Sequence, residues 1–175
     1  MRVSRLSGKH ARVLAALFLS SAAAAAYACS CGAGAPGRMT GGGSLICAGA
    51  AYRYTFGYEL HCKSGSAPIS TPNNLEVNLL TGEHFHLGSL TTATCSGPDA
   101  STPSAPFDTM RGTGTGTLDG QPASISFTLV DKAEPGAGAD FASFTIRTAA
   151  GNVLQCGNTL EGGNNQAHQV TGNKP

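Results

Sequence analysis

Histidines and carboxylates recur two residues apart in this chain, a spacing that could bring metal ligands together. Glu59 and His61 are so spaced, and so are His84 and His86. Residues two apart in a β-strand project to the same side of a sheet, so His84 and His86 can present two imidazoles together. His61 or a carboxylate would supply a third ligand for Zn²⁺ or Cu²⁺, with His168 as a further ligand. The alternative, more common for such a pattern, is a solvated sheet face.

A second carboxylate group, Asp131, Glu134 and Asp140, falls within one glycine-containing loop. Oxygen ligands on such a loop could hold Ca²⁺, although their spacing departs from that of an EF-hand. An acidic loop in solvent is the alternative. Ca²⁺ is therefore a weaker expectation than Zn²⁺ or Cu²⁺, and the favoured expectation is no resident cofactor.

Catalytic signatures are missing from the sequence. The Gly112–Gly116 run is followed by neither a Lys-Ser/Thr pair nor a helix pattern, so a phosphate cradle lacks its mechanism. No Gly-x-Ser-x-Gly elbow is present. Glu59 and Glu76 could face each other as a glycosidase pair, and Cys29–Cys31 could exchange disulfides, but neither has further support. The sequence predicts a protein that is not an enzyme.

Short alternating segments must position these residues. From Tyr52 to Cys62, apolar and aromatic residues occupy the even positions, as in a half-buried antiparallel strand. The same alternation recurs, more briefly, over 75–79, 84–95, 125–129 and 144–146. The Gly/Thr alternation of 109–117 is typical of an exposed edge strand. Short strands between turn signals predict an all-β fold, an antiparallel β-sandwich or barrel-like domain stabilised by disulfides.

The N-terminal segment, from Met1 to Ala28, has the features of a secretory signal peptide. Four basic residues precede a short apolar run over 13–19, and an Ala-x-Ala site ends at Ala28. The run is too short for a transmembrane span. Cleavage would make Cys29 the first residue, so a lipid anchor there is the alternative to free secretion, although Ala26 stands where a lipobox prefers Leu. We expect a secreted or cell-envelope protein, in the periplasm or at the cell surface.

The mature chain divides into three segments. Residues 29–43 are rich in Gly and Ala and predict a flexible leader, residues 44–170 a single β domain, and residues 171–175 a tail. Once the signal segment is removed, seven basic residues stand against ten acidic ones. This balance, with no basic patch, argues against nucleic acid, so the expected partner is a protein or a ligand at the cell surface.

All six cysteines follow the signal segment, which argues for disulfides in an exported chain. Cys62 ends one apolar-faced strand and Cys95 lies just past another, so these two form the first expected pair. Cys47 with Cys156 is the second. Because six cysteines can pair in many ways, the spacing leaves the connectivity open.

Seven short strings, in this order, resemble the bacterial post-choice-of-anchor-P domain family. They are Gly37–Gly43, Tyr58–Cys62, Pro72–Asn78, Phe85–Leu87, Gly112–Gly116, Glu134–Gly136 and Gly162–His168. The resemblance covers roughly residues 37–170 and implies an exported, compact module, often found behind an anchor-associated region. We expect the module to form the whole mature chain here. The resemblance implies no reaction.

Overall fold

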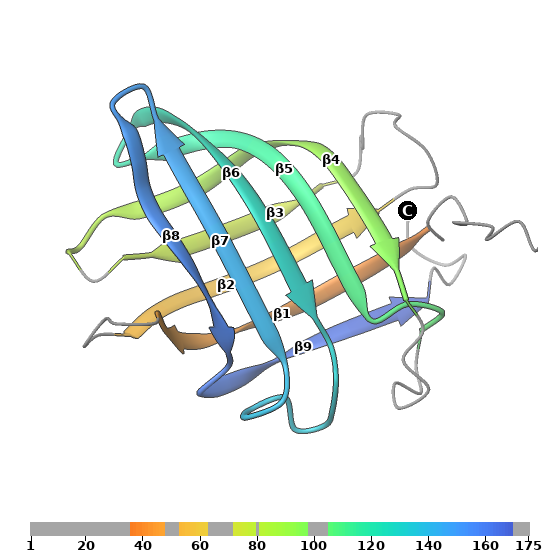
Figure 1. Cartoon of the computed structure of the whole chain (residues 1–175). Coiled ribbons are helices and arrows are strands. Elements are labelled where there is room, and N and C mark those ends of the chain that lie inside the picture. The colour runs from red at the N-terminus through yellow and green to blue at the C-terminus, as the bar shows by residue number, and fades with distance from the viewer. Residues whose placement is uncertain (1–35, 48–52, 63–71, 80, 98–104, 170–175) are drawn as a thin grey trace, which may run out of the picture. The chain divides into compact units, whose positions relative to one another are not determined.

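Nine antiparallel strands build one curled sheet, a half-barrel (Figure 1). The computed structural model describes residues 36–47, 53–62, 72–79, 81–97 and 105–169. The strands are β1 (Gly37–Ile46), β2 (Arg53–Cys62), β3 (Asn74–Asn78), β4 (His84–Ser96), β5 (Thr109–Leu118), β6 (Gln121–Val130), β7 (Phe141–Thr148), β8 (Gly151–Thr159) and β9 (Gly162–Gln169). Their order across the sheet is β8-β7-β6-β5-β4-β3-β2-β1-β9. The expected all-β, antiparallel fold is confirmed.

The curl brings two groups of strands face to face. In Figure 1, β5 to β8 cross in front of β1, β2, β3 and β9, and β4 curves from one group to the other. The described residues contain no helix, and therefore none long and apolar enough to cross a membrane. The space between the two groups holds the core.

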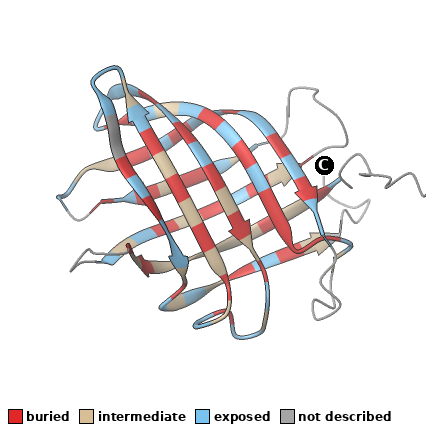
Figure 2. Ribbon diagram, in the orientation of Figure 1, coloured by how far each residue is buried: buried red, intermediate tan, exposed pale blue. Residues whose placement is uncertain are grey.

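Side chains at alternate strand positions are buried and fill that core (Figure 2). In β2, for example, Phe56, Tyr58, Leu60 and Cys62 are buried, and the residues between them are more exposed. Burying one large apolar side chain contributes about 1.5–3 kcal/mol, so the alternation itself drives the sheet to curl around its apolar face. The strand expected between Tyr52 and Cys62 is thus present, with its predicted inner face.

The prediction of a flexible leader over residues 29–43 is wrong where β1 begins. The composition of residues 29–43 predicts flexibility, but a strand begins at Gly37 and pairs with β2 on one side and β9 on the other. A Cβ atom on Gly41 would lie 2.4 Å from the Asn164 carbonyl oxygen, and one on Gly43 would lie 2.3 Å from that of Gly162. These glycines let neighbouring backbone approach closely, which composition alone cannot distinguish from flexibility. The domain therefore begins before residue 44.

The prediction of an edge strand over residues 109–117 is wrong, because β5 is an inner strand. It lies inside the sheet, paired with β4 and β6 along its length. A Cβ atom on Gly112 would lie 2.5 Å from the Phe127 ring, and one on Gly114 would lie 2.5 Å from a Leu87 methyl carbon. The glycines face inward and make room for larger side chains. Two register shifts interrupt the pairing of β4 with β5, between Leu87 and Ser89 and between Leu90 and Thr92.

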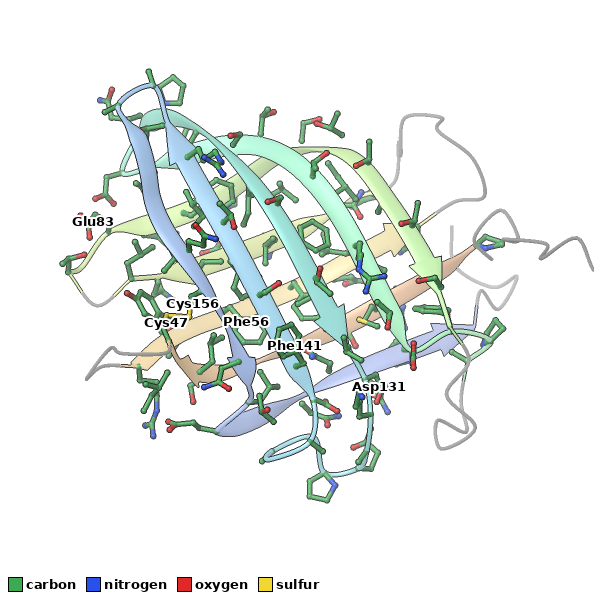
Figure 3. All side chains as sticks on the ribbon, viewed as in Figure 1. Cys47, Phe56, Glu83, Asp131, Phe141 and Cys156 are labelled. Atoms are coloured by element: carbon green, nitrogen blue, oxygen red, sulfur yellow. A yellow bond between two sulfur atoms is a disulfide. The ribbon has the colours of Figure 1, made fainter. Side chains whose placement is uncertain are left out.

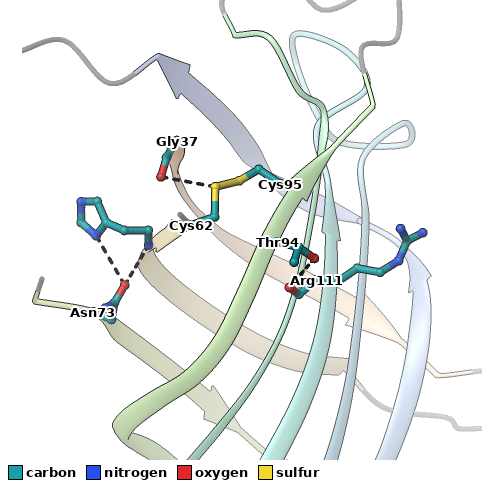
Figure 4. The surroundings of a disulfide bond; sticks show 7 residues. Gly37, Cys62, Asn73, Thr94, Cys95 and Arg111 are labelled. Carbon is teal, nitrogen blue, oxygen red and sulfur yellow. Dashed lines mark hydrogen bonds between the residues drawn. A yellow bond between two sulfur atoms is a disulfide. The ribbon is translucent and has the colours of Figure 1, made fainter. Parts of the chain in front are cut away.

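Two disulfides tie the sheet, and both expected pairs are confirmed. Cys47–Cys156 has a Cα–Cα distance of 5.1 Å, and Cys62–Cys95 one of 5.9 Å, both usual for disulfides (Figures 3 and 4). Cys47 follows β1 and Cys156 lies in β8, two strands that are not neighbours in the sheet. This bridge therefore links strands that the curl brings together. Structural disulfides indicate an oxidising, extracellular type of compartment.

The expected signal peptide, Cys29 with its alternative lipid anchor, and the tail 171–175 lie outside the described residues.

Candidate functional site

An imidazole–carboxylate cluster lies on the outer face of β3 and β4. Glu76 pairs with His86 in the strand register, next to the pair of Asn78 with His84. Because Val77 and Phe85 take the core side, strand alternation turns Glu76, His84 and His86 outward. We refer to these three residues as the Glu76 cluster.

Glu76 hydrogen-bonds both imidazoles at once. Its Oε1 atom lies 2.8 Å from Nδ1 of His86, and its Oε2 atom is bonded to Nε2 of His84. Hydrogen bonds from His86 and then His84 lower the pKa of Glu76, and burial opposes them. An ionised carboxylate only accepts, so the facing ring nitrogens carry the protons. The side chains of Glu76, His84 and His86 are 36%, 42% and 54% exposed, so solvent and ions reach all three.

The turn between β5 and β6 holds the backbone of His84. Asp119 Oδ1 accepts the backbone N–H of His84 at 3.0 Å, and the Asp119 N–H donates to the His84 carbonyl at 3.1 Å. Asp119 and Gly120 have φ values of 47° and 78°, typical of a tight hairpin turn. The Asp-Gly dipeptide predicts the turn, but not its contact with His84.

His61, the third expected metal ligand, lies elsewhere. Its backbone N–H donates to Asn73 Oδ1 at 2.8 Å, and its ring Nδ1 lies 3.4 Å from the same oxygen (Figure 4). Gly57 is the β2 residue opposite Glu76. His61 is four residues further along β2, about 13 Å at the usual strand rise. The structure therefore brings together His84 and His86, but not His61.

His168 is also separate from the Glu76 cluster. It lies on β9 opposite Arg38, and its Nε2 atom is 2.8 Å from the Thr40 hydroxyl. Burial, and then the Arg38 charge, lower the pKa of His168, with Glu59 opposing. A neutral imidazole can accept the Thr40 proton, so this contact holds β9 to β1. Across the described ranges, no three His, Cys, Asp or Glu side chains converge as they stand on one metal position.

The two candidate glycosidase carboxylates, Glu59 and Glu76, bind different side chains and do not face each other. Glu59 Oε1 accepts a hydrogen bond from Arg38 at 3.1 Å, and Glu76 holds the two imidazoles. Glu59 stands opposite Asn74, not Glu76, in the β2–β3 register. Their arrangement gives no paired acid and base.

The loop between β6 and β7 uses its carboxylates on backbone amides. Asp140, with no exposed surface, accepts the N–H groups of Lys132 and Ala133 on Oδ1, at 2.7 and 3.2 Å, and that of Asn165 on Oδ2, at 2.7 Å. β9 is an end strand of the sheet, so the Asn165 amide would otherwise be open for edge pairing. Both oxygens of Asp140 are thus used on backbone amides, a role that the loop composition does not indicate.

Asp131 repeats this contact one pleat along β9. Its Oδ2 atom accepts the Ala167 N–H at 2.8 Å, and the residue is 3% exposed (Figure 3). Burial raises the pKa of Asp131, which the Ala167 hydrogen bond opposes and the Asp140 charge reinforces. Glu134, the third carboxylate of the loop, is exposed and accepts from the Asn164 amide at 3.0 Å. The loop between β6 and β7 thus binds β9 through these hydrogen bonds.

Asn165 completes this buried network. Its Oδ1 atom accepts the Tyr58 hydroxyl at 2.8 Å, and its Nδ2 group donates to the carbonyls of Val130 and Phe141, both at 3.0 Å. Burial, followed by the Asp140 and Asp131 charges, raises the pKa of Tyr58 well above its usual range. Sequence reasoning missed this network, because its members are far apart in the chain and several partners are backbone atoms.

A groove lined by hydroxyl groups crosses the outer face of β4 to β7. Its volume is about 290 Å³. Short polar side chains and one cation line it: Thr91, Thr113, Thr115, Ser124, Ser126, Thr145 and Arg147. Hydroxyl groups both donate and accept hydrogen bonds, and Gly114 and Ile125 add apolar surface, so the groove offers both polar and apolar contacts. The sequence signalled this face only as polar residues alternating with core residues.

Comparison with known protein families, with curated proteins and with solved structures finds no match to this chain.

Proposed function

We propose that the chain is an exported, non-catalytic structural or binding module of the bacterial envelope or cell surface. The observation that carries this proposal is the pair of disulfides across the curled sheet. Stable disulfides form outside the reducing cytosol, where they stabilise small domains by restricting the unfolded chain. The signal-peptide pattern from Met1 to Ala28 supports the same destination.

The non-catalytic part of the proposal rests on how the polar groups are used. Glu59 is paired with Arg38, and Asp140 accepts three backbone amides. A general acid or base needs a titratable group that faces a substrate position. The carboxylates of the β6–β7 loop instead face β9. They hold the fold together, which suits a module that works by its surface.

The binding part of the proposal rests on the hydroxyl-lined groove. It lies on the outer face of strands that are hydrogen-bonded on both sides, so its lining is held in place by the sheet. The ordered strings that resemble the post-choice-of-anchor-P family support an exported module, and we propose membership of that family. Two of these strings, Gly37–Gly43 and Gly162–His168, lie side by side as β1 and β9.

Expression of the full chain in a bacterial host, followed by cell fractionation and intact mass measurement, tests the proposal. We expect a periplasmic, surface or released product that begins at Cys29 and has lost two hydrogens per disulfide. A Cys29→Ser variant distinguishes the two modes of export, because it abolishes detergent partitioning only if Cys29 carries lipid. Cytoplasmic retention with free thiols would contradict export. Reproducible substrate turnover, lost on changing one polar residue, would contradict the non-catalytic role.

A further inference from the structure

We propose that Glu76, His84 and His86 form a binding site for a divalent transition-metal ion of the Zn²⁺ and Cu²⁺ class. The third ligand in this site is Glu76, not His61. The site is independent of export and of the hydroxyl-lined groove, since it lies on β3 and β4 and uses none of the groove residues.

The donor chemistry matches this class of ion. Imidazole nitrogen binds both Zn²⁺ and Cu²⁺, and one carboxylate oxygen with two imidazoles is an established donor set that leaves a position for water. Glu76 is hydrogen-bonded by both rings, so its negative charge is already directed at the two nitrogens. A bound cation would take the place of the two ring N–H groups that now donate hydrogen bonds to Glu76.

The ring separation is close to what a shared ion requires. With metal–nitrogen distances of about 2.0 Å and tetrahedral angles, two imidazoles on one Zn²⁺ have ring centroids about 5 Å apart. The His84 and His86 centroids are 6.4 Å apart. As the three side chains stand, Glu76 lies between the rings, so no ready-made trio is present among the described residues. All three are substantially exposed, so a change of side-chain rotamer can bring the nitrogens towards one ion.

The backbone beneath the cluster is well fixed. His86 and Glu76 are direct cross-strand partners, and His84 is two residues from His86 on the same face. Asp119 holds the His84 backbone through two hydrogen bonds. Ligands on paired strands are positioned more accurately than ligands on loops, which favours a defined site over loose surface binding.

Calorimetric titration of the purified mature protein tests the site, with ZnCl₂ and CuCl₂ in separate runs. A Cys29→Ser/Cys31→Ser background removes thiols that could bind either ion. We expect one ion per chain and a loss of affinity of at least about tenfold in His84→Ala, in His86→Ala and in Glu76→Gln. The matched control is His61→Ala, which removes an imidazole from the same sheet and should leave the affinity within about twofold.

Spectroscopy and stability measurements complete the test. Nitrogen coupling in the Cu²⁺ electron paramagnetic resonance spectrum should be present in the parent and reduced in His84→Ala. Thermal unfolding of the ion-free variants should match the parent, which separates loss of a ligand from loss of the fold.

Binding of only one of the two ions would support the site and narrow its class. A parent dissociation constant weaker than about 100 µM, roughly −5.5 kcal/mol, would overturn it. An effect of His61→Ala equal to that of His84→Ala would overturn the ligand set.

Discussion

Asp140 is expected to be the residue whose loss most weakens the attachment of β9. Its two carboxylate oxygens accept three backbone N–H groups, from Lys132, Ala133 and Asn165, and it has no exposed surface. An unsatisfied buried donor costs about 1–3 kcal/mol, and water entering the space left by Asp140→Ala would satisfy part of the deficit. We therefore expect Asp140→Ala to lose about 3–6 kcal/mol, a large share of the roughly 5–15 kcal/mol of a typical domain.

Two further variants calibrate this value. Asp140→Asn keeps the shape and one acceptor oxygen, but turns an amide nitrogen towards a donor, so we expect a loss of about 1–3 kcal/mol. Glu134→Gln is the matched control, because Glu134 lies in the same loop, is exposed, and accepts its hydrogen bond from Asn164 on an oxygen that Gln retains. Its stability should stay within about 0.5 kcal/mol of the parent.

Urea unfolding followed by Tyr fluorescence provides the global measurement, since the chain has four Tyr and no Trp. Amide hydrogen exchange gives the local one, and the Asn165 amide should exchange faster in Asp140→Ala than in the parent, relative to amides of β2. The reasoning fails if Asp140→Ala costs no more than Glu134→Gln. It also fails if Ca²⁺ stabilises the parent and not Asp140→Ala, because the carboxylate would then serve a cation.

Two more perturbations test the closure of the sheet. Cys47→Ala/Cys156→Ala removes a disulfide of sequence separation 109 and should lower the free energy of unfolding by about 4.8 kcal/mol. Removing Cys62–Cys95, of separation 33, should lower it by about 3.7 kcal/mol. Urea unfolding that shows the reverse order would contradict the chain-entropy account. Burial raises the folded pKa of Asp131, so its contribution to stability is fully present below the unfolded value near 3.8 and is lost as the pH rises through the folded value. Asp131→Asn should therefore gain stability relative to the parent between pH 3.5 and pH 7, and equal differences in urea unfolding at the two pH values would refute the assignment.

Local pattern is sufficient for the strands that alternate apolar and polar residues, and for the inward position of the cysteines that they carry. Period-two alternation marks the inner face of a strand, so the alternation alone assigns Cys62, on the inner face of β2, to a buried bridge. Glycine in a strand carries no such mark. Gly41 and Gly43 admit close backbone neighbours, and Gly112 and Gly114 admit large side chains. Their composition resembles a linker or an edge, and only the packing against other strands distinguishes the cases.

Contacts between side chains and backbone cannot be predicted from the sequence pattern. The Asp140 carboxylate meets the Asn165 amide 25 residues away, and every residue except proline offers such an amide. Composition therefore identifies the acidic loop but offers only solvent or a cation as its partner. The buried position of Asp140, with backbone donors on both oxygens, is a property of how the sheet closes.

The candidate metal cluster contains one contact that the sequence can predict and excludes one histidine whose position it cannot predict. His84, His86 and Glu76 belong to one hairpin, whose short turn is closed by the hydrogen bond from Leu79 N–H to the Glu83 carbonyl. A short turn fixes the register, so a sequence that predicts this hairpin also places Glu76 beside His86. The connection from β2 to β3 is longer and leaves the register open, so alternation could assign His61 to the outer face but not to a row on it. Ligands within one tight hairpin are thus predictable from sequence, whereas a ligand across a long loop is a matter of register.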